Sequence, residues 1–258
     1  MMVIGAMSAP EQDHTNDIED PQMPLTAHLE ELRRRLLWTG ATIMVAFVVA
    51  WGFSQHILTF IQEPLKPFAT LQFDTLTDPF FSHLKAAFFA ALFVTFPVTL
   101  SQIWLFVSPG LYRSEKHMVW PFLLISFPLF VGGGSFFYYV VFPFAIDFLI
   151  HFDESLVPSL RIGDYLSFTL RLVFVFGLVF ELPLISLLLT RLGVIDSRML
   201  SRFRRYAIVI IFVVAAILTP PDIITQLLLA GPLLILYELS ILVSWIVGRG
   251  KPKAEEPE

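Results

Sequence analysis

The sequence predicts an all-α, polytopic membrane protein with six transmembrane helices, and three observations support this fold class. Hydrophobic residues make up 56% of the 258 residues and charged residues only 15%, whereas a soluble domain carries about a quarter charged residues. Residues 86–107 form 22 residues without a charge, about 33 Å of helix, which spans a hydrocarbon core of roughly 30 Å. Lys and Arg are also biased toward alternate connections, as expected for a multi-pass protein.

The chain divides into a membrane domain between two polar ends. Residues 1–23 hold five carboxylates and no Lys or Arg, and they lack the basic start and apolar core of a signal peptide. We expect them to form a disordered acidic tail. Residues 24–248 are the predicted six-helix transmembrane domain. It opens with a surface helix at 24–35, where leucines recur at helical spacing. Residues 249–258 are expected to be a disordered C-terminal tail.

The six predicted spans are the apolar segments 36–53, 80–107, 118–142, 165–190, 206–218 and 223–247. The third contains three consecutive glycines at 132–134, which permit close helix approach or a bend. The fifth has 13 residues, about 20 Å of helix, which is short for the full core. The Thr-Pro-Pro-Asp sequence at 219–222 follows at once and leaves no room for a loop. The last two spans are therefore predicted to be a short, tight hairpin.

Charge placement predicts the orientation. Thirteen Lys and Arg residues lie in the termini and in the connections on the same side as the termini, and three, Lys66, Lys85 and Arg161, lie on the other side. The remaining one, Arg171, lies within the fourth span. Because positive charge is retained on the cytoplasmic side, both termini are predicted to be cytoplasmic in a cell inner membrane.

The sequence does not carry a standard catalytic pattern. It contains no HExxH, GxSxG or P-loop motif, its six histidines are scattered, and it has no cysteine. An enzymatic activity, a metal site and a cofactor are therefore not expected. The informative groups are carboxylates in and beside the membrane.

Two carboxylates are predicted on the cytoplasmic side. Glu31 lies on the surface helix and Glu115 on the first cytoplasmic connection. Each could bind an arginine guanidinium through both carboxylate oxygens. Alternatively, Glu31 lies four residues before Arg35, and Glu30 lies four residues before Arg34, so that ordinary helix ion pairs would account for both. The sequence leaves both interpretations of the surface-helix carboxylates open.

Glu181 lies near the middle of the fourth span. A charged side chain there costs ~2.5–3.5 kcal/mol on insertion scales, so it is expected to face a protein interior and to serve function. Arg171 is ten residues away, about 15 Å along one helix, so a different partner is expected. Glu238 in the last span is a second such case, and Gln102 a milder one.

Two polar residues flank the turn of the final hairpin. Thr219 and Gln226 could hydrogen-bond to another transmembrane helix. They could equally cap the hairpin itself, and the sequence leaves the two interpretations open.

Four segments together resemble one family. They are HLEELRRRL at 28–36, FVSPGLYRSEK at 106–116, FELP at 180–183 and TPPD at 219–222. Each is weak alone, but their order, the span lengths and the short last pair resemble the TatC family, the multi-span core subunit of the twin-arginine, Sec-independent protein translocase. The resemblance covers residues 24 to about 250.

The resemblance implies a concave, glove-like arrangement of six helices. It implies a receptor that binds twin-arginine signal peptides at the cytoplasmic face. With single-span TatA and TatB-like partners, such a receptor exports folded proteins by using the proton-motive force. It also implies a homo-oligomer within the complex, contact with the lipid bilayer, and no cofactor or nucleic acid.

Site residues follow from the same resemblance. Glu31 and Glu115 match the acidic residues that contact the arginines of the signal peptide. Positions around that site are matched by Arg33, Gln102, Phe106 and Tyr112.

Further matches lie elsewhere in the domain. Pro64 matches a structural proline of the first outer loop, and Glu181 matches a membrane carboxylate on the concave face. Thr219 and Gln226 match polar contacts to a partner's transmembrane helix. Arg171 departs from the resemblance, because the family is expected to be apolar or small there. We expect Arg171 to snorkel outward with Asp164.

Two other functions compete with this interpretation. A secondary transporter of a small solute or ion could use Glu181 and Glu238 as membrane-buried carboxylates. It would predict internal repeats, and none is visible. An intramembrane enzyme would need a nucleophile–base pair or a metal set, which scattered histidines and absent cysteines do not favour.

Overall fold

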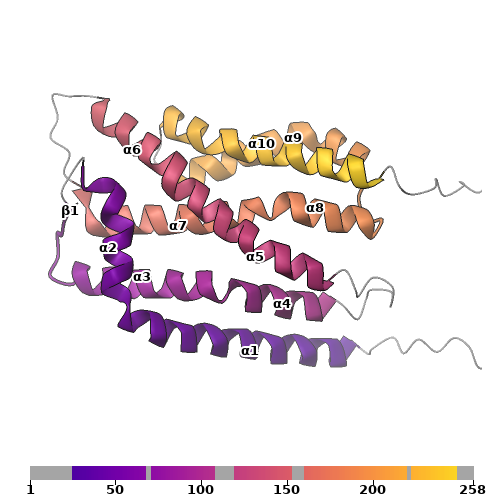
Figure 1. Ribbon diagram of the computed structural model, residues 1–258, viewed down its shortest axis with the longest axis horizontal. Helices are drawn as coiled ribbons and strands as arrows, with labels where there is room; N and C mark the ends of the chain where they lie inside the picture. The colour runs from indigo at the N-terminus through magenta and orange to yellow at the C-terminus, as the bar shows by residue number, and fades with distance from the viewer. Residues whose placement is uncertain (1–24, 68–70, 108–118, 153–159, 220–221, 249–258) are drawn as a thin grey trace, which may run out of the picture.

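The computed structural model describes residues 25–67, 71–107, 119–152, 160–219 and 222–248 (Figure 1). Nearly all of them are helical, which confirms the all-α prediction. In chain order the elements are α1 (Leu25–Gly52), α2 (Ser54–Gln62), η1 (Glu63–Leu65), β1 (Leu71–Gln72), α3 (Asp78–Val94), α4 (Phe96–Val107), α5 (Val119–Phe136), η4 (Phe137–Val141), α6 (Phe142–His151), β2 (Leu160–Arg161), α7 (Ile162–Phe180), α8 (Leu182–Arg191), α9 (Ser197–Leu218) and α10 (Ile223–Gly248).

The long helices lie side by side in one direction, and α5–α6 crosses them obliquely (Figure 1). Helix α1 packs against α3 and α4 at one edge, and the hairpin of α9 and α10 lies at the other edge beside α7 and α8. Helix α1 begins and α10 ends at the same end of the molecule, here called the termini end. Helix α2 and strand β1 lie at the opposite end, here called the loop end. This common end agrees with an even number of crossings.

Helix α1 joins two predicted segments. The surface helix expected at 24–35 and the span expected at 36–53 form one helix of 28 residues without a break. The following outer loop contains the nine-residue helix α2 and the short 3₁₀ helix η1. Pro64 lies half-buried near the start of η1, next to the buried Leu65. Pro64 therefore lies in the first outer loop at the loop end, as predicted for this residue's position in the chain.

Two predicted spans are broken rather than straight. Helices α3 and α4 meet at Thr95 with a bend of 51°. Helices α7 and α8 meet at Glu181. In each case a proline, Pro97 or Pro183, follows the break by two residues, and its missing N–H and bulky ring prevent the helix from continuing regularly. Glu181 therefore lies at a helix junction, although residues 162–191 still form one span, in agreement with the predicted fourth crossing.

The number of crossings agrees only partly with the prediction from length and composition. Within the described residues, four helices are long and apolar enough to cross a membrane, and the bent α3–α4 pair makes up to five. Helix α9 has 22 residues, but its first turns carry Arg202, Arg204 and Arg205, so its uncharged part is short. The assignment of α9 as a sixth crossing therefore still depends on the Lys and Arg distribution.

The core between α5 and α7 depends on glycine. A Cβ added at Gly133 would lie 2.5 Å from the carbonyl oxygen of Phe176, and one at Gly177 would lie 2.6 Å from the Phe130 ring. Phe130 is fully buried and stacks on Phe96 with the ring centroids 3.7 Å apart. The glycines thus allow the close helix approach that the sequence predicted.

Candidate functional site

A polar cluster lies at the termini end, between α1 and α4. Arg35 Nε donates a hydrogen bond of 3.0 Å to Glu31 Oε1, and Arg35 Nη1 donates one of 3.4 Å to Gln102 Oε1. Glu31 and Arg35 lie one turn apart on α1, while Gln102 comes from α4. The side chains of Glu31 and Arg35 are each only 16% exposed, so this ion pair is partly shielded from water.

The second oxygen of Glu31 is different from the first. Within the described residues, Glu31 Oε2 is buried and has no hydrogen-bond partner. A buried carboxylate oxygen without a donor is costly, and a ligand that supplies an N–H relieves that cost. The helix ion pair is therefore present, and it leaves the second oxygen without a partner among the described residues; ligand binding by this oxygen stays a prediction.

Other predicted residues surround this cluster to different degrees. The ring of Phe106 stacks on His28 with centroids 4.3 Å apart and an interplanar angle of 17°, which ties the end of α4 to α1. Arg33 is exposed on α1. Glu115 and Tyr112 lie outside the described residues, so their relation to the cluster stays a prediction.

Glu181 occupies a second polar position, deep in the apolar layer. It is 3% exposed, and its Oε2 accepts a hydrogen bond of 2.7 Å from the hydroxyl of Ser126 on α5. Its Oε1 has no partner among the described residues. Ser126 is the different partner that the sequence analysis expected but did not identify. The sequence feature that could have identified it is that Ser126 is the only hydroxyl residue in the apolar run 119–131.

Two membrane charges differ from the expectations. Glu238 is about half exposed and forms an ion pair of 2.8 Å with Arg204 of α9, so it is not a second buried carboxylate. Arg171 is exposed on α7 as expected, but within the described residues it forms no ion pair with Asp164. The sequence did not predict the Glu238–Arg204 pair because spacing along one helix does not reveal contacts across helices.

The polar residues of the final hairpin bond within the hairpin. The Thr219 hydroxyl donates 2.8 Å to the Ala215 carbonyl, and Gln226 Nε2 donates 3.0 Å to the Phe212 carbonyl. These bonds close the end of α9 and join it to α10. They favour the capping interpretation, and contact with a partner helix stays a prediction.

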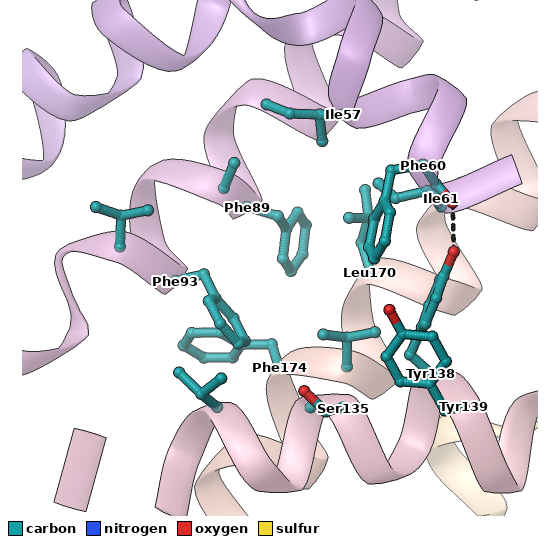
Figure 2. Close-up of a pocket in the computed structure, with 15 residues that line it drawn as sticks. Ile57, Phe60, Ile61, Phe89, Phe93, Ser135, Tyr138, Tyr139, Leu170 and Phe174 are labelled. Carbon is teal, nitrogen blue, oxygen red and sulfur yellow. Dashed lines mark hydrogen bonds between the residues drawn. The ribbon is translucent and has the colours of Figure 1, made fainter. Parts of the chain in front are cut away.

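A separate apolar cavity of about 340 Å³ lies between α2, α3, α5, η4 and α7. Figure 2 shows Phe89, Phe93 and Phe174 lining one part of it, and the Tyr138 hydroxyl bonded to the Phe60 carbonyl at another. Its lining contains no charged side chain. The cavity therefore does not coincide with either carboxylate. Over the described residues, no three His, Asp or Glu side chains gather as a possible metal site.

Comparison with known proteins matches this arrangement. A family model described as Sec-independent protein translocase protein (TatC) matches residues 27–232. The TatC protein of Magnetococcus marinus is 41% identical over 249 residues, covering 94% of this chain and 91% of the relative. The TatCy protein of Bacillus subtilis is 39% identical and covers 86% and 89%. A crystal structure of a twin arginine translocase receptor, TatC, superposes with a TM-score of 0.78 at 38% identity, covering 84% of this chain and 97% of that one.

Proposed function

Because the chain belongs to the TatC family of Sec-independent protein translocase proteins, we propose that it is the subunit that binds paired-arginine signal peptides at its termini end. The protein is a translocase component with several transmembrane helices, and its family is not an enzyme family. The finer proposal concerns which groups bind the peptide, which side of the membrane they face and which partners assist.

One observation carries the proposal: the partly shielded Glu31 has one free, buried oxygen beside Gln102. A guanidinium presents planar N–H groups that match carboxylate and amide oxygens. A first peptide arginine would donate to Glu31 Oε2. Glu115 and Tyr112 would bind the second arginine, with Arg33 and Phe106 at the margin, as the family resemblance implies.

The proposed orientation places this cluster in the cytoplasm, with the protein in the cell inner membrane. The Lys and Arg distribution supports it. Since the chain has no cysteine, a single cysteine at position 66 or 202 would be its only thiol. An impermeant maleimide should label position 66 and not position 202 in intact cells. Labelling of position 202 from outside would contradict the orientation.

Single-span TatA and TatB-like proteins are the proposed partners, in a complex that holds several copies of this chain. Helix α9 supports this, because only Ala215 on it is buried, which leaves most of its surface open to another helix. Glu181, Thr219 and Gln226 would meet partner residues only after some of their present bonds rearrange.

A small-solute transporter has less support. The buried pair of carboxylates that motivated it is reduced to Glu181, since Glu238 is exposed and ion-paired. The family match also points to protein translocation. No observation on the described residues favours solute transport.

The test is peptide binding by the full-length protein in lipid nanodiscs. A twin-arginine peptide should bind the parent tightly, and Glu31→Gln should weaken it. Glu30→Gln is the matched control. Glu30 is the exposed neighbour on the same helix, and its substitution removes the same negative charge as Glu31→Gln. Equal weakening by both variants would show that overall charge, not the Glu31 site, attracts the peptide.

A further inference from the structure

Two basic side chains lie within the membrane helices at the loop end. Lys85 is seven residues from the start of α3, and Arg171 is nine residues from the start of α7, about 10 Å and 13 Å along the helix axes. A charge at such a depth is costly, and it usually marks a functional site. Neither residue belongs to the peptide site described above.

The structure places the Lys85 side chain against α7, one turn before Arg171. Lys85 Nζ donates 2.8 Å to the Ser167 hydroxyl and 3.5 Å to the Gly163 carbonyl, both on α7. Arg171 lies one turn after Ser167, so their Cβ atoms are about 5–6 Å apart. Long helical side chains also lean toward the helix start. We therefore expect the guanidinium to extend toward the level of the Lys85 ammonium.

The surface around the pair faces lipid. Phe81 and Phe88, which flank Lys85 on α3, are 49% and 46% exposed, and Leu178, two turns after Arg171, is 43% exposed. Arg171 itself is exposed, while Lys85 is half-buried. An apolar, exposed surrounding on membrane helices is the surface that acyl chains cover.

The nearby carboxylates form no direct ion pair with Lys85 or Arg171, although Asp78 attracts Lys85 over a longer distance. Asp78 accepts hydrogen bonds from the Asp74 and Thr75 amides and from the Thr75 hydroxyl. Asp74 forms an ion pair of 2.7 Å with Arg161. Asp164 is exposed two turns before Arg171. Within the described residues, no ion pair involves Lys85 or Arg171.

We propose that Lys85 and Arg171 bind the phosphate of an anionic phospholipid in the leaflet at the loop end. Lys85 binds α7 one turn before Arg171; two like charges on this surface repel in a low-dielectric setting, and a phosphate between them replaces repulsion with attraction. Arginine binds phosphate through two N–H groups, and lysine adds a point charge. Both side chains would extend toward the loop end to reach the headgroup level, and the acyl chains would cover the exposed phenylalanines.

The alternative occupant is a carboxylate on a partner's transmembrane helix. The lipid is favoured because the Lys85 ammonium lies at the level of Gly163 and Ser167, in the first two turns of α7, and because the apolar surroundings of the two cations match acyl chains. The proposal does not depend on peptide binding or on which side is cytoplasmic. Failure of either proposal can therefore be recognised separately.

The first experiment measures lipid retention by the full-length protein with native mass spectrometry. Phosphatidylglycerol should be retained in preference to phosphatidylcholine. Lys85→Gln and Arg171→Gln should each weaken phosphatidylglycerol retention about fivefold, as expected for removal of one surface cation. Arg161→Gln is the matched control on the same side, because it removes one charge that Asp74 already pairs. Retention equal to the parent in both test variants would overturn the proposal.

A second measurement uses the unmodified protein, in case a variant does not fold. Phosphatidylglycerol in nanodiscs should protect Lys85 from an amine-reactive label, and phosphatidylcholine should not. Equal labelling in the two lipids would overturn the proposal. So would unchanged lipid retention in Arg171→Gln together with loss of a single-span partner, which would identify a protein carboxylate as the occupant.

Discussion

Glu31 and Glu181 have the same bonding pattern in very different surroundings. Each has one oxygen that accepts a hydrogen bond and one buried oxygen that has no partner among the described residues. Glu31 lies at the termini end with a 16% exposed side chain, and its donor is a charged arginine. Glu181 is 3% exposed at a break between two helices, and its donor is a serine. Glu31 therefore lies closer to solvent than Glu181, which a ligand can reach only if helices move.

The largest expected effect separates the two carboxylates by peptide binding. Glu31→Gln should weaken binding of a twin-arginine peptide by roughly 10- to 150-fold, since a hydrogen bond to a charged group contributes about 1.5–3 kcal/mol. Glu181→Gln should leave the same dissociation constant unchanged. Isothermal titration calorimetry on protein in nanodiscs checks both. A comparable loss of peptide affinity in the two variants would mean that both substitutions disturb the overall fold, and that Glu31 is not a separate peptide site.

The next effect concerns stability and export. Glu181→Ala removes the acceptor of the Ser126 hydroxyl and leaves a void, so it should lower the free energy of unfolding by about 1–3 kcal/mol. Glu181→Gln keeps an acceptor oxygen and should lower it by about 1 kcal/mol or less. Export of a folded cargo should therefore fall more with Ala than with Gln, while peptide binding survives both. Export at the parent rate in Glu181→Ala would remove Glu181 from the transport mechanism.

These two sites also show how far sequence predicts structure. The charge distribution and the apolar runs predicted the helices, but the bend at Thr95 was not predicted, although Pro97 follows it by two residues. The partner of Glu181 was not predictable, because hydropathy identifies a buried face without identifying the helix opposite. Glu238 was misassigned for a similar reason, since only the packing of α9 on α10 brings Arg204 to it.

A smaller effect tests whether Arg35 competes with the peptide. Arg35 occupies Glu31 Oε1 and Gln102 Oε1, and it repels an incoming arginine. Arg35→Gln should strengthen peptide binding by about two- to threefold, because a helix ion pair contributes ~0.5 kcal/mol. Arg34→Gln is the control, since Arg34 is exposed on the same helix. Weaker binding in Arg35→Gln would show that Arg35 orients Glu31 for the peptide instead.

The smallest effect is expected at Glu238. Its ion pair with Arg204 is about half exposed on both sides, and exposed pairs contribute roughly 0–1 kcal/mol. Glu238→Gln should change the melting temperature in detergent by no more than about 2 °C and leave export intact. A strong export defect in this variant would restore Glu238 as a functional membrane carboxylate.

The most direct test of the Glu31 site is a double-mutant cycle between protein and peptide. Dissociation constants are measured for the parent and Glu31→Gln, each with a twin-arginine peptide and with peptides in which one arginine is lysine. If a peptide arginine pairs with the free oxygen of Glu31, the coupling energy for one of the two arginine positions should be about 1.5–3 kcal/mol. A coupling energy near zero at both positions, with each single change still weakening binding, would contradict that pairing.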